Sequence, residues 1–119
     1  MPYQPKHTNI NIQGGRVIDP KSGLDTVADV FIAEGCIAAI GESPEGFIAE
    51  RTIDASGKMV CPGLVDLSTR LGSLESELEA AVSGGVTAIA CPPDTNPPLD
   101  EPGLVERLVR RSEALGLAR

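Results

Sequence analysis

The sequence predicts an α/β protein in which a small domain of short strands precedes a segment of alternating strands and helices. Residues 1–61 alternate short apolar runs with glycine-rich turns, whereas residues 62–119 contain two continuous apolar runs, each followed by a helical pattern. Strand, helix, strand, helix implies right-handed crossovers and a parallel sheet. Two such units neither close a barrel nor complete an open sheet. We therefore expect either a piece of a larger fold or a small domain that associates to complete its core.

The first half is expected to consist of strands joined by tight turns. Ile10 and Ile12 alternate with polar residues, which is typical of a half-buried strand. Gly14-Gly15 and the segment 20–23 are predicted turns. Glu34-Gly35 is a predicted hairpin turn. Further strands are predicted over residues 16–19, 27–33, 36–40, 52–55 and 58–61.

The second half is expected to contain two strands and two helices. Residues 64–67 and 86–91 are apolar enough for buried parallel strands. Ser73 is a candidate N-cap for a helix that Gly84-Gly85 ends. A second helix is predicted from about residue 100 to Gly116, with its apolar residues on one face and with Glu106 placed to pair with Arg110.

The net charge and the number and spacing of the cysteines exclude several classes of function for this protein. The net charge is −7, and no basic cluster stands out, which argues against nucleic acid or an anionic membrane surface as partner. No apolar run approaches the ~20 residues of a membrane span, and the N-terminal segment does not look like a signal peptide. The three cysteines, Cys36, Cys61 and Cys91, form no C-x-x-C pair, and we expect Cys61 and Cys91 to be buried thiols in a reduced, cytoplasmic setting. His7 is the only histidine and cannot hold a catalytic metal alone.

Several short motifs follow one another along the chain, each occurring once. They are G-R-V-I-D-P at 15–20, D-V-F-I at 29–32 followed by G-C-I-A-A-I-G at 35–41, I-D-A-S-G at 53–57, P-G-L-V-D at 62–66, G-G-V-T at 84–87 and P-D-T-N-P-P at 93–98. Each motif is weakly specific alone. Their order and spacing together are similar to those of the cyclic amidohydrolase family, and of the dihydroorotases in particular.

The resemblance implies both a fold and a departure from the family's chemistry. It implies a composite β-domain over 1–61, followed over 62–119 by the first two β/α units of a (β/α)8 barrel, which is incomplete in this chain. In the family, the segment matching 62–70 reads P-G-[LIV]-[IV]-D-x-H-x-H, and its two histidines open a metal site. Ser68 and Arg70 stand at those positions here. The family's later metal ligands have no counterpart in this chain.

Ser68 and Arg70 are poor metal ligands on physical grounds. Side chains at i and i+2 of a strand share a face, so a histidine pair there could reach one zinc ion. Serine offers a weak, normally protonated oxygen, while arginine has only donors and a permanent positive charge. We therefore expect no metal, no cofactor and no catalytic residue in this chain. Without the resemblance, residues 68–70 are simply a polar strand end.

Two further departures concern the substrate. Dihydroorotases usually continue with an R-E-P-G loop whose arginine binds the substrate carboxylate, but Leu71 is followed directly by Gly72-Ser73. This leaves the chain roughly eight residues short, either by deletion or because a mobile segment is missing from it. Asp94 stands where the family carries an asparagine, and an ionised carboxylate there would repel a substrate carboxylate. Taken alone, Asp94 is an ordinary turn former and Asp66 an acceptor that fixes a loop.

Three functions are compatible with these residues. The replaced positions favour a non-catalytic dihydroorotase-like subunit, similar to those that pair with the aspartate carbamoyltransferase catalytic chain in a hetero-oligomer of the pyrimidine pathway. The main alternative is an active zinc-dependent dihydroorotase or hydantoinase whose ligands lie outside this chain. The third is a standalone β-rich binding module.

Overall fold

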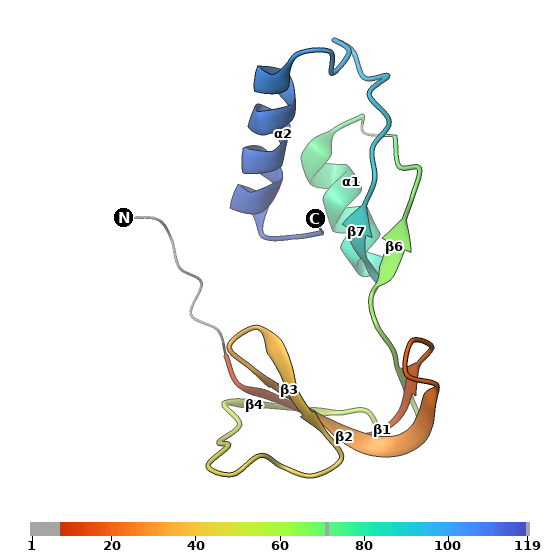
Figure 1. Ribbon diagram of the computed structural model, residues 1–119, viewed down its shortest axis with the longest axis vertical. Helices are drawn as coiled ribbons and strands as arrows, with labels where there is room; N and C mark the ends of the chain where they lie inside the picture. The colour runs from red at the N-terminus through yellow and green to blue at the C-terminus, as the bar shows by residue number, and fades with distance from the viewer. Residues whose placement is uncertain (1–7, 71, 119) are drawn as a thin grey trace. The chain divides into compact units, whose positions relative to one another are not determined.

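The computed structural model describes residues 8–70 and 72–118, and these divide between two compact units, Met1–Pro62 and Gly63–Arg119 (Figure 1). His7, interpreted above as a lone histidine unable to hold a metal, lies outside the described residues. The first unit holds β1 to β5, and the second holds β6, α1, β7 and α2 in chain order.

The first unit is a mixed five-stranded sheet built around its first strand. Its strands are β1 (Ile10–Asp19), β2 (Leu24–Ala33), β3 (Cys36–Ile40), β4 (Arg51–Asp54) and β5 (Met59–Val60). Their order is β3-β2-β1-β4, with β5 also pairing with β1. Antiparallel pairing joins β1 to β2 and β2 to β3, whereas β4 and β5 run parallel to β1. Strand β1 is therefore paired along both of its edges.

The predicted turn at Gly14-Gly15 was wrong, because β1 continues through it as a β-bulge. The register with β2 shifts between Ile12 and Gly15, and Gly14 has φ of +67°, a conformation that glycine adopts without strain. The Gly14 amide donates to Asp29 Oδ1 at 2.9 Å. This side-chain acceptor replaces the ladder partner that the bulge removes. The Glu34-Gly35 hairpin turn is confirmed, with both residues at positive φ.

The first unit buries a small apolar core. Val17, Val30, Phe31 and Ala55 are each at most 5% exposed. Phe31 packs edge-on against Phe47 from the connection between β3 and β4, with ring centroids 5.2 Å apart. The long connection visible in Figure 1 is thus anchored to the sheet by an aromatic contact.

On the exposed part of the sheet, Arg16 and Asp25 form a two-pronged ion pair between β1 and β2. Arg16 Nε and Nη2 donate to the two oxygens of Asp25, each at 2.6 Å. The hydrogen bond from Arg16, followed by its charge, lowers the pKa of the Asp25 carboxyl below its ordinary value. The carboxyl therefore stays ionised further into the acid range than a free aspartate.

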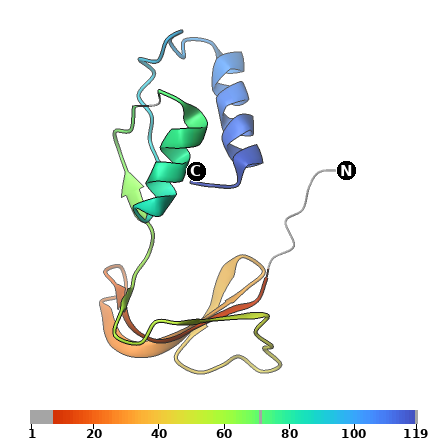
Figure 2. The same cartoon turned by 180° about the vertical axis from the view of Figure 1, so that it is seen from behind.

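The second unit combines a parallel strand pair with two helices. It contains β6 (Leu64–Asp66), α1 (Leu74–Ser83), β7 (Val86–Ile89) and α2 (Pro102–Leu115). The predicted parallel arrangement is confirmed, since β6 pairs with β7 in the same direction. Figures 1 and 2 show α1 between the strand pair and α2. Leu78 is fully buried in a cluster with Leu74 and Ala118.

Local sequence sets the helix ends. Ser73 is the N-cap of α1, as predicted, although its side chain makes no capping hydrogen bond. Helix α2 begins with Pro102, a residue suited to the first turn, and ends before Gly116 at φ +62°. The predicted ion pair between Glu106 and Arg110 is present. Neither helix in the described part of the chain has both the length and the hydropathy that a membrane span requires.

Two burial predictions were wrong. Leu64 and Val65 are 58% and 61% exposed because, within residues 8–70 and 72–118, β6 pairs with β7 and with no other strand. Cys61 is exposed as well, since β5 ends at Val60. Cys91 lies half-buried after β7.

Candidate functional site

The carboxyl ends of β6 and β7 place the predicted site residues next to one another. Beyond the paired residues, the Ala90 amide donates to the Asp66 carbonyl at 2.7 Å, and the Thr69 amide donates to the Ala90 carbonyl at 3.0 Å. These bonds keep the two chain segments side by side after the strands end. Ligand sites in α/β proteins are commonly built at this end of parallel strands.

Asp66 fixes the turn that follows β6. Its Oδ1 accepts a hydrogen bond from the Ser68 amide at 2.9 Å. This is the loop-fixing role predicted for an aspartate at a strand end. Among the described residues, the Ser68 side chain makes no hydrogen bond.

Arg70 and Asp94 form an ion pair across the two strand ends. Arg70 Nη2 lies 3.1 Å from Asp94 Oδ2, and the two side chains are 80% and 52% exposed. The structure thus joins two of the three positions that the sequence singled out. Within the described part of the chain, neither side chain forms a hydrogen bond or ion pair with Ser68.

This donor set does not fit a divalent cation. The Arg70 guanidinium has no lone pair to offer a metal ion. The Asp94 carboxylate already forms an ion pair with that guanidinium. Within residues 8–70 and 72–118, no three His, Cys, Asp or Glu side chains come together in a group that could hold a metal ion. We therefore derive no metal-dependent step from these residues.

Thr69 is a polar residue that sequence reasoning did not single out. Its Oγ1 is buried and has no hydrogen-bond partner among the described residues. Thr69 is half-buried, whereas its neighbours Ser68 and Arg70 are exposed. No pattern in the sequence distinguishes it from them, because all three residues are polar.

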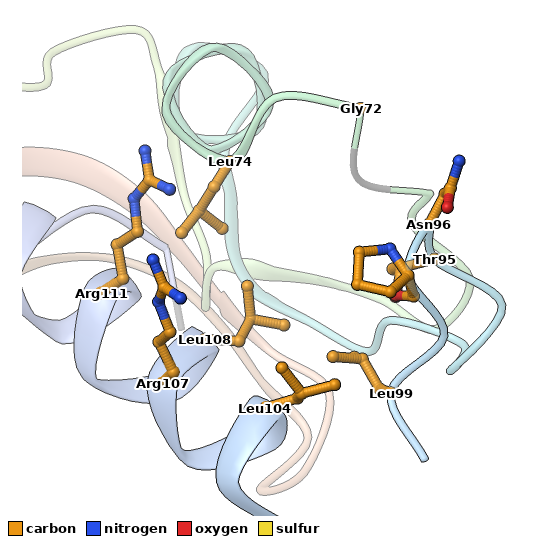
Figure 3. Close-up of a pocket in the computed structure, with 10 residues that line it drawn as sticks. Gly72, Leu74, Thr95, Asn96, Leu99, Leu104, Arg107, Leu108 and Arg111 are labelled. Carbon is orange, nitrogen blue, oxygen red and sulfur yellow. The ribbon is translucent and has the colours of Figure 1, made fainter. Parts of the chain in front are cut away.

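A pocket of about 320 Å3 lies between the two helices and the loop that follows β7, and we call it the α1–α2 pocket (Figure 3). It contains none of the three predicted positions, so sequence reasoning missed it. Its lining residues are Gly72, Leu74, Thr95, Asn96, Pro97, Leu99, Leu104, Arg107, Leu108 and Arg111. Arg111 Nη2 lies 3.3 Å from Glu75 Oε1 and thereby connects α2 to α1.

Comparison of the sequence with known proteins gives a consistent result. No family model matches the chain. It is 47% identical over 118 residues to a dihydroorotase-like protein of Pseudomonas aeruginosa, with 92% of this chain and 28% of that protein covered. A dihydroorotase-like protein of Pseudomonas putida is 50% identical over 111 residues, which is 87% of this chain and 26% of the relative. A dihydroorotase of Geobacter metallireducens is 36% identical, over 91% of this chain and 27% of its own length.

This chain is similar to dihydroorotases. It spans about a quarter of the length of the dihydroorotase-like proteins and dihydroorotases that it matches. The family resemblance inferred from the motifs therefore agrees with relatives named dihydroorotase-like protein and dihydroorotase.

Solved structures give the same relationship at the level of the fold. An L-hydantoinase (dihydropyrimidinase) from Arthrobacter aurescens matches 76% of this chain with 34% identity and a TM-score of 0.66, over 22% of its own chain. A molinate hydrolase matches 95% of this chain with 27% identity and a TM-score of 0.68, over 29% of its own chain. The small α/β fold with its β-rich first unit is thus shared with hydrolases of known structure.

The length of one alignment also differs from the part of this chain that it covers. The match to the Pseudomonas aeruginosa protein extends over 118 residues, yet it involves only 92% of the 119 residues of this chain. That relative therefore has residues with no counterpart here. The surplus is comparable in size to the roughly eight residues by which the resemblance predicts this chain to be short.

Proposed function

We propose that this chain is part of a non-catalytic dihydroorotase-like subunit that supports the assembly and activity of aspartate carbamoyltransferase in pyrimidine biosynthesis. In this proposal the subunit forms a cytoplasmic hetero-oligomer with the transferase catalytic chain. It contributes a folded scaffold, and neither a metal nor a cofactor participates through the residues of this chain.

The ion pair between Arg70 and Asp94 is the observation that carries this proposal. Under the resemblance, Arg70 replaces a metal-binding histidine and Asp94 replaces an asparagine that would meet the substrate. A guanidinium at 3.1 Å from a carboxylate neutralises that carboxylate and leaves it unsuited to a divalent cation. Two replacements that complement each other in charge are consistent with a site that no longer has to bind metal or substrate.

The names of the relatives support the dihydroorotase-like part of this proposal. The two relatives named dihydroorotase-like protein are 47% and 50% identical to this chain, whereas those named dihydroorotase from Geobacter metallireducens and Trichlorobacter lovleyi are 36% identical.

We further propose that the second unit begins a (β/α)8 barrel. Parallel strands are normally covered on both faces, yet Leu64, Val65 and Leu67 are 58%, 61% and 79% exposed. Burial of these side chains by further parallel strands and their helices would account for the apolar sequence of β6. The share of the relatives that this chain spans, 28% and 26% for the two Pseudomonas proteins, leaves room for such strands.

The test uses the full-length protein and the transferase catalytic chain. The two are purified separately and together, and particle mass and carbamoyltransferase activity are compared. We expect a larger particle and higher transferase activity for the mixture. A transferase that is fully active alone and never co-migrates with the full-length protein would refute the proposal.

The similarity to an L-hydantoinase favours one alternative, an active zinc-dependent cyclic amidohydrolase whose ligands lie outside this chain. Metal analysis and an assay of dihydroorotate hydrolysis discriminate between the two functions. Stoichiometric zinc together with turnover would establish the enzyme and overturn the non-catalytic proposal.

A further inference from the structure

The α1–α2 pocket has an apolar interior that the described residues of this chain leave uncovered. Figure 3 shows Leu74 from α1, Leu99 from the loop, and Leu104 and Leu108 from α2 turned toward one space. Of these four, only Leu74 is buried, and the other three are half-buried. With a volume of about 320 Å3, the pocket is at the small end of the ~300–1,000 Å3 range of small-molecule sites. An apolar group of a few carbons would bury these leucines further.

The α2 side of the pocket carries excess positive charge. Arg107 and Arg111 are one turn apart on α2, and both line the pocket. Glu75 contacts Arg111 at 3.3 Å, but no carboxylate of the described residues lies within ion-pair distance of Arg107. Two cations at i and i+4, with one carboxylate paired to Arg111, leave the α2 side of the pocket positive, although Glu77 lies near Gly72 elsewhere on the lining and the chain as a whole has a charge of −7. This local charge is complementary to an anion.

We propose that the α1–α2 pocket binds a small organic anion, namely a carboxylate with a short apolar body. The leucines receive the apolar body, and the Arg107 guanidinium binds the carboxylate, whose planar shape matches its donors. This site is separate from the Arg70–Asp94 pair and does not depend on the proposed function.

The test is a titration of the full-length protein with hexanoate, followed by calorimetry, with hexan-1-ol and acetate as comparison probes. Arg107→Gln removes the charge at the rim, and Arg110→Gln is the matched control. Arg110 lies on the same helix and loses the same charge, but it pairs with Glu106 and does not line the pocket. Both arginines are exposed, so we expect both variants to fold.

We expect Arg107→Gln to weaken hexanoate binding about tenfold, as the loss of one charge-assisted hydrogen bond predicts, and Arg110→Gln to leave it within about twofold. Hexan-1-ol and acetate should each bind at least about tenfold more weakly than hexanoate, because each lacks one half of the interaction. The proposal is overturned if hexanoate shows no saturable binding, if hexan-1-ol binds equally well, or if both variants weaken binding to the same extent. Since neither transferase nor metal takes part, this result is independent of the test of the proposed function.

Discussion

Substitution of Gly63 by alanine tests the packing between the start of β6 and the start of β7. A Cβ atom at residue 63 would lie 2.1 Å from Thr87 Oγ1, 2.3 Å from Thr87 Cγ2 and 2.7 Å from Thr87 Cβ. Rotation of the threonine side chain moves the first two atoms but leaves its Cβ in place. The backbone must therefore shift, although the Leu64 amide holds it by donating to the Gly85 carbonyl at 2.9 Å.

The magnitude follows from two opposing contributions. Overpacking costs about 1–3 kcal/mol, and contacts this short put the cost at about 3 kcal/mol. Loss of glycine's freedom in the unfolded chain offsets up to about 1 kcal/mol. The net destabilisation is about 2 kcal/mol. This corresponds to roughly 30-fold faster hydrogen exchange of those β6 and β7 amides that exchange through one shared opening of the strand pair.

Hydrogen–deuterium exchange of the full-length protein measures this change. Gly103→Ala is the control, because a Cβ there meets nothing within 4 Å and the first turn of a helix favours alanine over glycine. Adding Thr87→Ala to Gly63→Ala removes the two closest atoms but not the Cβ, so it should restore part of the protection. Exchange within twofold of the wild type for Gly63→Ala, or no recovery with Thr87→Ala, would refute the packing argument.

Three further predictions concern the core and the two ion pairs. Leu78→Ala should destabilise the second unit by about 3 kcal/mol, since the side chain is fully buried, and faster exchange of the α1 amides checks it. Asp25→Asn should remove a contribution to stability that depends on pH. The hydrogen bond from Arg16 lowers the pKa of the Asp25 carboxyl in the folded protein. The contribution is therefore fully present above the ordinary aspartate pKa and is lost as the pH falls through the lowered pKa. Urea unfolding at pH 7 and pH 3 should show the gap between wild type and variant closing at the lower pH. A double-mutant cycle with Arg70→Gln and Asp94→Asn should give a coupling below about 1 kcal/mol that decreases with added salt, because both groups are exposed.

Local sequence predicted the elements whose ends depend on single residues. Pro102 and Gly116 mark the limits of α2 because the ring of proline fits the first helical turn and glycine accepts the left-handed conformation. The parallel pairing of β6 and β7 followed from the helix between them, since parallel strands require such a crossover.

Features that depend on distant partners were not predictable in this way. Gly14-Gly15 has the composition of a turn, yet the strand continues through it, and the Gly14 amide donates to the Asp29 carboxylate supplied by β2. Leu64 and Val65 have the composition of a buried strand, but burial requires neighbours that local sequence does not specify.

The candidate site shows the same division. The sequence identified Ser68, Arg70 and Asp94 as unusual residues, but their contacts depend on how far the chain segments continue side by side beyond β6 and β7. The hydrogen bonds of Ala90 and Thr69 determine this, and no local pattern encodes them. The α1–α2 pocket likewise arises from three separate segments whose residues look ordinary along the sequence.

The position of β1 in its sheet has a consequence for synthesis on the ribosome. The antiparallel partner of β1 follows closely in the chain, so the hairpins of β1, β2 and β3 can form early. Its parallel partners are residues 51–54 and 59–60, which leave the ribosome later. Until they do, one edge of β1 presents unpaired amides and carbonyls to other nascent chains. Translation pauses that hold residues 51–60 inside the ribosome should therefore increase aggregation of this protein more than pauses that occur after these residues have emerged.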